Sequence, residues 1–232
     1  MAIGGHGLTT VQFTSSGNWV CPAGVTRVIL IGQGAGQGGQ GGSTLINVPA
    51  RGGKGTVPCM KVISVVPNTT YAITIGTGGS GTTSGGVLGG SGGDTLFAGL
   101  ATFPGANSTY ELTGSGTGIT PGGINNPLTS GQSIPNGVWG QSIPSFGGNS
   151  AGSNPNYRPG GSAGGGSKDA GGTGGNANNS GAGSAGGTPS GYGCGGGAGG
   201  NGSTVGGTGG NGGPGMLFIC WGEELFKKKR FY

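Results

Sequence analysis

Short apolar runs alternate along this chain with long polar stretches that are rich in glycine. Three of the runs, at residues 25–31, 61–66 and 71–75, are rich in β-branched residues and are bounded by glycine or proline. β-Branched side chains favour strands, and glycine and proline mark where strands end. A fourth apolar run occupies residues 216–221. The pattern therefore predicts β-strands separated by glycine blocks, with little or no α-helix.

Two parts of the N-terminal region have the pattern of β-hairpins. Residues 10–20 alternate apolar and polar side chains on either side of a Ser-Ser-Gly-Asn turn signal. Further along, a strand is expected at residues 57–66, a turn at residues 67–70 and the partner strand at residues 71–75. We expect the two strands of each pair to lie side by side.

Glycine makes up 67 of the 232 residues, and two of the expected strands run directly into glycine blocks. Disorder is the compositional default for such blocks, because glycine loses much backbone entropy on folding and buries no side chain. Glycine-rich chain can be ordered instead as polyproline II helices with three residues per turn, packed against helices of the same kind. Many glycines within residues 160–202 share one three-residue phase, which shifts after Val205. This spacing predicts several short polyglycine II helices joined by turns, whereas the scarcity of proline disfavours collagen.

These patterns together predict an all-β fold, in which a small β-sandwich-like domain merges with a packed layer of polyglycine II helices. Only 31% of the residues are hydrophobic, so the conventional core must be small. We expect a strand and glycine-block domain at residues 1–100, a polar, aromatic-bearing loop region at 101–159, a polyglycine II region at 160–215, the closing strand of the first domain at 216–221 and a basic C-terminal tail at 222–232.

The net charge of +5 is unevenly distributed. Four of the ten basic residues lie together at residues 227–230, and between Val62 and Tyr157 the only charged residues are Asp94 and Glu111. A groove that tracks phosphates needs a basic surface, so we expect no nucleic-acid partner. The N-terminal residues lack a signal-peptide pattern, and no apolar run approaches the roughly 20 residues that cross a bilayer. We therefore expect synthesis in the cytoplasm without a signal peptide, and no membrane insertion.

The residues that carry most enzyme chemistry are scarce. The single histidine is His6, and the five acidic residues show no pairing suited to general acid and base catalysis. Cys21, Cys59, Cys194 and Cys220 form no C-x-x-C pair, so the spacing supports neither a zinc site nor a redox centre. We expect free thiols, no metal, no cofactor and no enzymatic activity.

The aromatic residues fall into two groups. Trp19 and Trp221 lie on or beside expected strands and should be core or interface residues, and Cys21 and Cys220, near them in the sequence, should be buried thiols. The second group lies among Asn, Ser, Thr and Pro, where rings can stack on sugars or pack against a protein. The candidate receptor-binding residues in this group are Trp139, Phe146, Tyr157 and Tyr192. Alternatively, Trp139 and Phe146 form a hydrophobic plug at the ends of the glycine layers.

Four blocks of sequence resemble the glycine-rich domain of phage tail fibres and related virion proteins. Residues 13–26 look like its opening, residues 65–76 like its central hairpin, residues 89–97 like its following turn and residues 213–219 like its closing strand. The composition is also similar to that of tail-fibre tip adhesins of T-even-like phages, which carry receptor-binding loops on a sandwich of polyglycine II helices.

The resemblance implies a non-enzymatic phage virion protein, at a tail-fibre tip or on a surface fibre, that contributes to host receptor recognition. Its partners would be other virion proteins and a host surface protein or glycan, and a homotrimer is left open. One alternative is a purely architectural virion protein of a capsid or collar. Another is an ice-binding or other extracellular glycine-rich structural protein, which the irregular threonine spacing disfavours.

The C-terminal tail combines apolar and basic residues, and we expect it either to dock into another virion protein or to be a solvated end. The residues that would dock are Leu225, Phe226, Lys227, Lys228, Lys229, Arg230, Phe231 and Tyr232.

Overall fold

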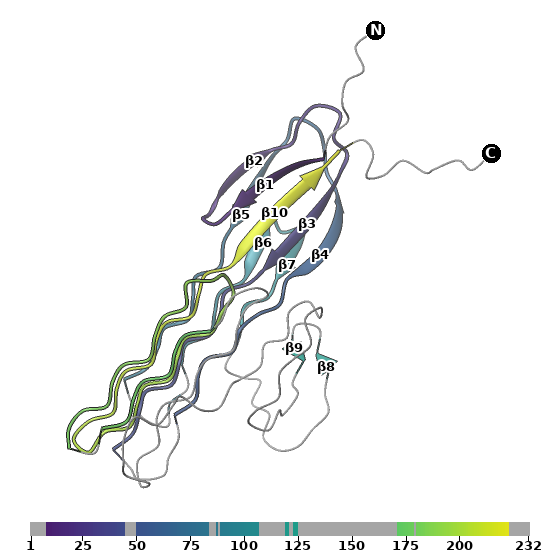
Figure 1. Cartoon of the computed structure of the whole chain (residues 1–232). Coiled ribbons are helices and arrows are strands. Elements are labelled where there is room, and N and C mark those ends of the chain that lie inside the picture. The colour runs from purple at the N-terminus through teal and green to yellow at the C-terminus, as the bar shows by residue number, and fades with distance from the viewer. Residues whose placement is uncertain are drawn as a thin grey trace.

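A β-sandwich forms one end of the molecule, and a long bundle of glycine-rich chain continues from it (Figure 1). The computed structural model describes residues 8–44, 50–83, 87, 89–106, 119–120, 123–124, 171–178 and 180–222. These residues contain no helix, and all of their paired strands are antiparallel. The predicted all-β fold is confirmed.

Two four-stranded sheets make up the sandwich. The first sheet has the order β1 (Thr9–Phe13), β10 (Met216–Trp221), β3 (Arg27–Gln33) and β4 (Cys59–Ser64). The second sheet has the order β2 (Gly17–Val20), β5 (Thr70–Thr74), β6 (Thr95–Phe97) and β7 (Ala101–Phe103). A separate pair joins β8 (Ile119–Thr120) to β9 (Gly123–Ile124). The last strand of the chain thus lies inside the first sheet, between β1 and β3.

Alternate residues of both sheets point inward and form the hydrophobic core. In β3 and β10 the inward positions are fully buried, as for Leu30 and Ile219. The second sheet contributes aromatic rings, and Tyr71 stacks on Phe97 with ring centroids 5.1 Å apart. Burying a side chain of this size contributes about 1.5–3 kcal/mol. Trp19 of the second sheet contacts Trp221 of the first, with ring centroids 5.5 Å apart. The buried residues of the core are Trp19, Cys21, Val28, Leu30, Val65, Tyr71, Ile73, Ile75, Phe97, Ala101, Phe103, Leu217 and Ile219.

The expected hairpin at residues 10–20 is wrong. Its two strands belong to different sheets, because β1 pairs with β10 and β2 pairs with β5. Phe13 on the first sheet and Trp19 on the second therefore both point into the core between the sheets, where they belong to the same cluster. Alternation along a strand shows which face is buried, but it does not distinguish a hairpin from an arch between two sheets.

The expected pairing of residues 57–66 with residues 71–75 is also wrong. β4 pairs with β3 in the first sheet, and β5 pairs with β2 and β6 in the second. The connection between them crosses from one sheet to the other and bonds back to Cys21, whose carbonyl accepts from the amide of Asn68 at 2.8 Å. The block at residues 89–97, expected as a turn, instead holds a glycine-rich segment followed by β6.

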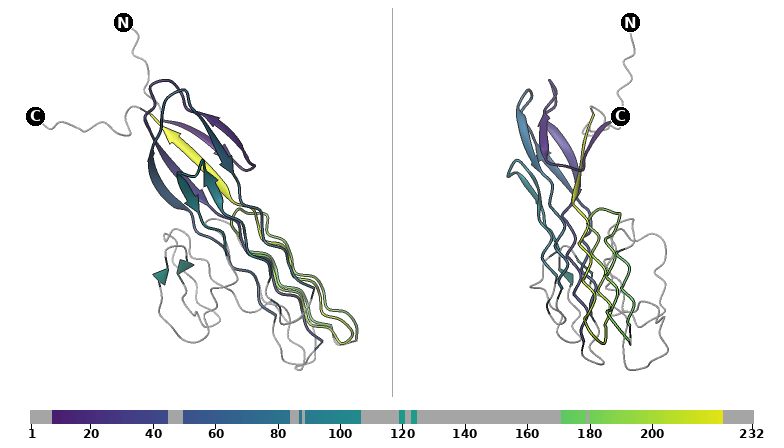
Figure 2. Two further views of the ribbon diagram at one scale, coloured as in Figure 1. Left: turned by 180° about the vertical axis from the view of Figure 1, so that it is seen from behind. Right: turned by 90° about the vertical axis from the view of Figure 1, so that its left-hand side faces the viewer.

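Glycine-rich segments continue from the strands as long parallel lines in each view of the molecule (Figure 2). The segments bond to one another at every third residue: Gly36, Gly39 and Gly42 donate to the carbonyls of Gly213, Gly210 and Gly207. A three-residue repeat is that of polyglycine II helices, as the sequence predicted. The segments run outward at residues 34–43, 76–83, 171–178 and 193–202, and return at 50–56, 89–93, 183–187 and 205–215. The predicted short helices joined by turns are therefore present in the described part of residues 160–215.

The helix at residues 34–43 is enclosed on all sides. Its amides form three rows, which donate to the helices at residues 205–215, 50–56 and 89–93. Its carbonyls accept from three further segments, at residues 76–83, 104–106 and 193–202. Every residue from 34 to 42 is buried. Hydrogen bonds between backbones thus order this glycine block where side-chain packing cannot.

Candidate functional site

The glycine bundle has a proximal end, which joins the sandwich, and a distal end, where its helices turn back (Figure 1). The hydrogen bonds fix this direction, since Gly36 pairs with Gly213 near β3 and β10, and Gly42 pairs with Gly207 further out. Two of the distal turns lie within or beside described residues, one at Asn178, Ser180 and Gly181 and the other at residues 202–205. These turns are the best-defined candidate site in the described part of the chain.

The two distal turns are bonded to each other. Asn178 closes its own turn, because its side-chain oxygen accepts from the amide of Ser180 at 3.1 Å. The carbonyl of Asn178 also accepts from the amide of Ser203 at 3.0 Å, and the carbonyl of Gly181 accepts from the amide of Thr204. The distal turns are therefore held in one arrangement by hydrogen bonds between them.

Buried amide side chains fix the distal half of the bundle further. Asn201 is fully buried, and its side-chain oxygen accepts from the amide of Ser43 at 2.9 Å. Gln40 is buried on the same central helix as Ser43, and its side-chain oxygen accepts from the amide of Arg51 at 2.9 Å. Each of these buried side chains forms its hydrogen bond with one particular neighbouring segment, whereas glycine backbones are interchangeable. The buried amides therefore help to determine which helices lie side by side.

The distal surface presents small polar groups and two exposed apolar side chains. Asn178, Ser180, Ser203 and Thr204 are exposed, and Val205 beside them is 53% exposed. Val87, which belongs to a third distal connection, is 55% exposed. Hydroxyl and amide groups can donate and accept hydrogen bonds without charge, and the valines add apolar contact. The surface is suited to binding rather than to proton transfer.

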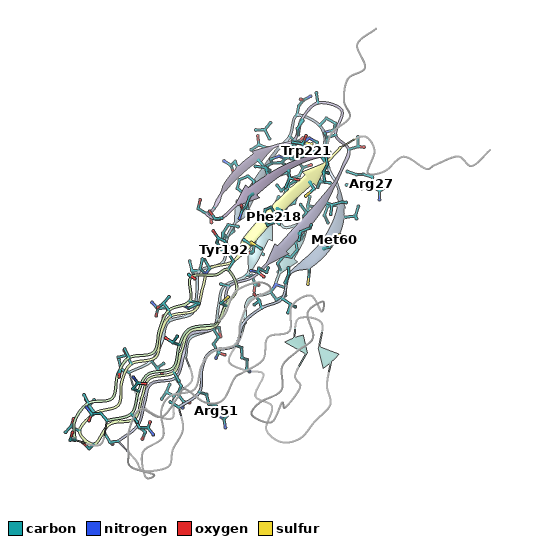
Figure 3. The ribbon with its side chains drawn as sticks, viewed as in Figure 1. Arg27, Arg51, Met60, Tyr192, Phe218 and Trp221 are labelled. Carbon is teal, nitrogen blue, oxygen red and sulfur yellow. The ribbon has the colours of Figure 1, made fainter. Side chains whose placement is uncertain are left out.

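Tyr192 is the one receptor-binding candidate that lies within the described residues. It is half-buried in the turn between residues 188 and 193, at the proximal end of the bundle and near the start of β10 (Figure 3). Gly193 completes this turn with a φ of 64°, a conformation that favours glycine. Tyr192 therefore does not share a surface with the distal turns. Trp139, Phe146 and Tyr157 lie outside the described residues, as do the tail candidates at residues 225–232.

The described chain also shows where residues 107–170, which carry Trp139, Phe146 and Tyr157, are attached to the bundle. It leaves the bundle at Ala106, whose amide donates to the carbonyl of Ala35 at 2.8 Å. It returns just before Gly172, whose amide donates to the carbonyl of Gly195 at 2.9 Å. Ala35 and Gly195 both lie in the proximal part of their helices, so both attachment points of residues 107–170 are proximal.

The sequence contained a signal for the distal turns that the list of aromatic candidates did not use. The glycine phase is broken at Asn178 and again after Gly202, where Ser203, Thr204 and Val205 follow. These two breaks coincide with the distal turns, although Ser184 and Ser190, which lie away from these turns, break the same phase. A search for aromatic residues misses them because the turns carry none.

None of the four cysteines forms a disulfide, and three of them are buried. Cys21 and Cys220 are buried near Trp19 and Trp221, as predicted, and Cys59 is half-buried. Burial raises the pKa of the Cys21 thiol. Among the described residues, no three His, Cys, Asp or Glu side chains are grouped so that they could hold a metal ion.

The structure defines a class of glycine-rich β-protein in which a sandwich continues into a hydrogen-bonded bundle of polyglycine II helices. A protein-family model described as "Glycine-rich domain" matches residues 9–222, from the first residue of β1 to the residue after β10. The chain belongs to this family, and the sandwich and the bundle both fall within the one match. A search of curated proteins finds no match. Within the described residues, no helix has the length and apolar character needed to cross a membrane.

Proposed function

We propose that this protein is a non-enzymatic structural component of a phage virion, at the tip of a tail fibre or on a surface fibre, where it contributes to host receptor recognition. The observation that carries the proposal is the separation of the two ends of the molecule. Thr9 pairs with Trp221 at the outer end of the sandwich, so the described chain enters and leaves at one place. The turns of the glycine bundle lie at the opposite end (Figure 1).

This separation suits a fibre tip. Attachment through either terminus would hold the sandwich and leave the distal turns pointing away. The helices between them are joined by repeated backbone hydrogen bonds, as between Gly196 and Gln37 at 2.9 Å, so the turns are presented on a stiff support. Stiffness lowers the entropy lost when a surface binds its partner.

The chemistry of the distal turns favours a neutral ligand, such as a glycan or an uncharged protein loop. Exposed hydroxyl and amide groups on Asn178, Ser203 and Thr204 can bond to sugar hydroxyls, and Val205 adds an apolar contact. Trp139, Phe146 and Tyr157 stay candidates for the same role, from a segment that attaches proximally.

The ice-binding alternative has less support. Solvent-facing positions do recur at every third residue, as at Thr77, Ser80 and Thr83, and at Thr208, Asn211 and Pro214. These rows mix residue types, whereas a surface that matches ice needs one regular array. The purely architectural alternative differs from our proposal only in receptor contact, which the experiment below tests.

The experiment uses a phage that carries the gene, with an antibody against the purified chain. Gold-labelled antibody should mark a fibre tip or surface fibre in electron micrographs of the particles. Particles that carry Val205→Asp together with Thr204→Asp should adsorb to host cells at least about tenfold more slowly, since a buried unpaired charge costs more than 1.4 kcal/mol. Val20→Asp together with Val66→Asp, at valines that are 61% and 62% exposed, is the control with the same added charge.

The outcomes separate the alternatives. Normal adsorption with both variants would reject the distal receptor site, and would leave either receptor contact by Trp139, Phe146 and Tyr157 or a purely architectural protein. Labelling that is absent from the particle would reject the virion role altogether.

A further inference from the structure

The outer face of the first sheet is apolar across three adjacent strands. The register of the strands places its side chains in cross-strand rows, since partners in register share a face. One row is Gln12, Phe218, Ile31 and Met60, and the next is Thr10, Cys220, Ile29 and Val62. Cys220 lies on this face but is only 8% exposed. We call the other five apolar residues of these rows the outer patch: Phe218, Ile29, Ile31, Met60 and Val62.

This face departs from the usual pattern of a sandwich. An antiparallel sheet that has one face in water carries polar residues on that face, and strands apolar on both faces are typical of sheets covered on both sides. β3 and β10 bury Leu30 and Ile219 in the core, and their outward side chains Ile29, Ile31 and Phe218 are half-buried. Met60 is 68% exposed and Val62 is 46% exposed on the neighbouring edge strand. Figure 3 shows Met60 and Phe218 on this sheet.

No charged side chain lies within the outer patch. Lys61, between Met60 and Val62, points to the other face, where its ammonium donates to the carbonyl of Thr102 at 2.7 Å and lies 5.3 Å from the ring centre of Phe103. Arg27 lies at the end of the face, in register with Ser64 and beyond the apolar rows. The patch is therefore neutral, and its boundary on the β1 side is polar.

We propose that the outer patch binds the outer patch of a second copy of this chain, sheet against sheet. A neutral apolar surface is complementary to itself, and contact of like with like brings no equal charges together. The alternative occupant is the chain's own basic tail, which begins after β10. That segment would place the four cations at residues 227–230 over a patch that offers no acidic partner, at a desolvation cost. The second copy is the better match.

The size of the patch sets the strength of the contact. The whole outer face of the sheet, of which the patch is the apolar part, has four strands about 4.8 Å apart with about six residues each at about 3.3 Å, so it covers at most roughly 400 Å². Two copies would bury about 800 Å², below the range of standard stable interfaces. We therefore expect a dimer with a dissociation constant in the micromolar range or weaker, and one that closes at two copies, because a self-complementary contact leaves no free face.

The test is sedimentation equilibrium of the full chain from about 1 µM to about 1 mM. The wild type should shift from monomer to dimer as concentration rises. Met60→Lys combined with Val62→Lys should raise the dissociation constant at least about tenfold, because two cations per copy then face each other across the contact. Val20→Lys combined with Val66→Lys adds the same charge at exposed valines outside the patch, and it should dimerise like the wild type. Thermal melts establish that all variants are folded.

Four results would overturn the proposal. A wild type that stays monomeric throughout rejects the second copy, and a dimer that appears only when residues 223–232 are deleted identifies the tail as the occupant. Equal weakening by both lysine pairs shows a general charge effect. A trimer at saturation rejects contact between identical faces.

Discussion

The amide of Gly39 donates a 2.8 Å hydrogen bond to the carbonyl of Gly210, which lies far along the chain on a helix running in the opposite direction. On another side, a methyl group added to Gly39 would overlap the carbonyl oxygen of Gly197. Gly39 thus lies between helices on several sides: it bonds to Gly210 and Thr82 of two of them, and the helix that carries Gly197 leaves no room for a side chain. The glycine is required by space rather than by an unusual backbone angle.

Gly39→Ala should therefore destabilise the protein strongly. The methyl group must push two backbones apart, and overpacking of this kind costs about 1–3 kcal/mol. For a chain of this size the melting temperature should fall by several degrees. Circular dichroism during thermal melting measures the effect.

Gly181→Ala is the matched control for this prediction. Its added methyl would meet only the end of the Asn178 side chain, at 3.2 Å, and a side chain can move aside. A melting temperature for Gly39→Ala equal to that of Gly181→Ala would mean that the helices are not packed as closely as the structure has them.

Asn201→Ala should cost more stability than Asn211→Ala, although both remove one amide that accepts a backbone hydrogen bond. The Asn201 oxygen accepts from Ser43 inside the bundle, and losing it leaves a poorly hydrated donor at a cost of about 1–3 kcal/mol. The Asn211 oxygen accepts from Gly81 at the surface, where water replaces it. Urea denaturation of the two variants gives the difference. Equal losses would show that Asn201 is not the buried link described above.

The longer apolar strands were predictable because their signal is local, whereas the three-residue strands β6 and β7 were expected as a turn and a loop. The closing strand begins and ends at the expected residues, Met216 and Trp221, and β3 and β5 lie within two residues of expectation. The choice of partner strand is not local. β10 is apolar on both faces and takes the place between β1 and β3, which leaves β2 to pair with β5. Both expected hairpins failed for this reason.

The glycine helices were predictable as helices but not as neighbours. One glycine backbone offers the same donors and acceptors as another, so nothing at Gly36 itself selects Gly213. The strands from which the helices continue, and a few buried amides such as Gln37 and Gln40, make that selection. The distal turns were visible as breaks in the glycine phase. Their meeting at one end depends on the path of the whole chain.

The free energy of unfolding should fall as the pH rises into the alkaline range, and Cys21 should account for part of this fall. Its thiol is buried, and its sulfur lies 3.3 Å from the carbonyl oxygen of Val25. Because burial raises the pKa above 9.0, the thiol in the unfolded chain ionises first as the pH rises. The contribution of Cys21 is therefore complete below pH 9.0 and decreases above it, until the folded thiol also ionises.

Comparison with Cys21→Ala isolates this contribution, since lysines and tyrosines titrate in the same range in both proteins. The difference in free energy of unfolding between wild type and variant should be constant below pH 9.0 and shrink above it. A difference that stays constant through alkaline pH would show that the Cys21 thiol has the same pKa in the folded and the unfolded chain.

Removal of the basic tail should affect assembly and leave the fold unchanged. The family match ends at residue 222, and the last described strand ends at Trp221, so deletion of residues 223–232 removes none of the described hydrogen bonds. If the tail docks into another virion protein, particles made with the deletion should carry less of the chain. Quantitative immunoblotting of purified particles measures this occupancy, and the melting temperature should stay within about 2 °C of the wild type, as for surface changes.

Two further variants separate the contributions of the tail's apolar and basic groups. Serine at Leu225, Phe226, Phe231 and Tyr232 removes the apolar groups, and serine at residues 227–230 removes the charge. Apolar groups that enter a groove supply most of the binding free energy and charges mainly speed association, so the first variant should reduce occupancy more. The charge variant should instead reduce the salt dependence of assembly. Full occupancy with the deletion would leave the tail as a solvated end, and the virion role would then rest on attachment through other surfaces of the sandwich.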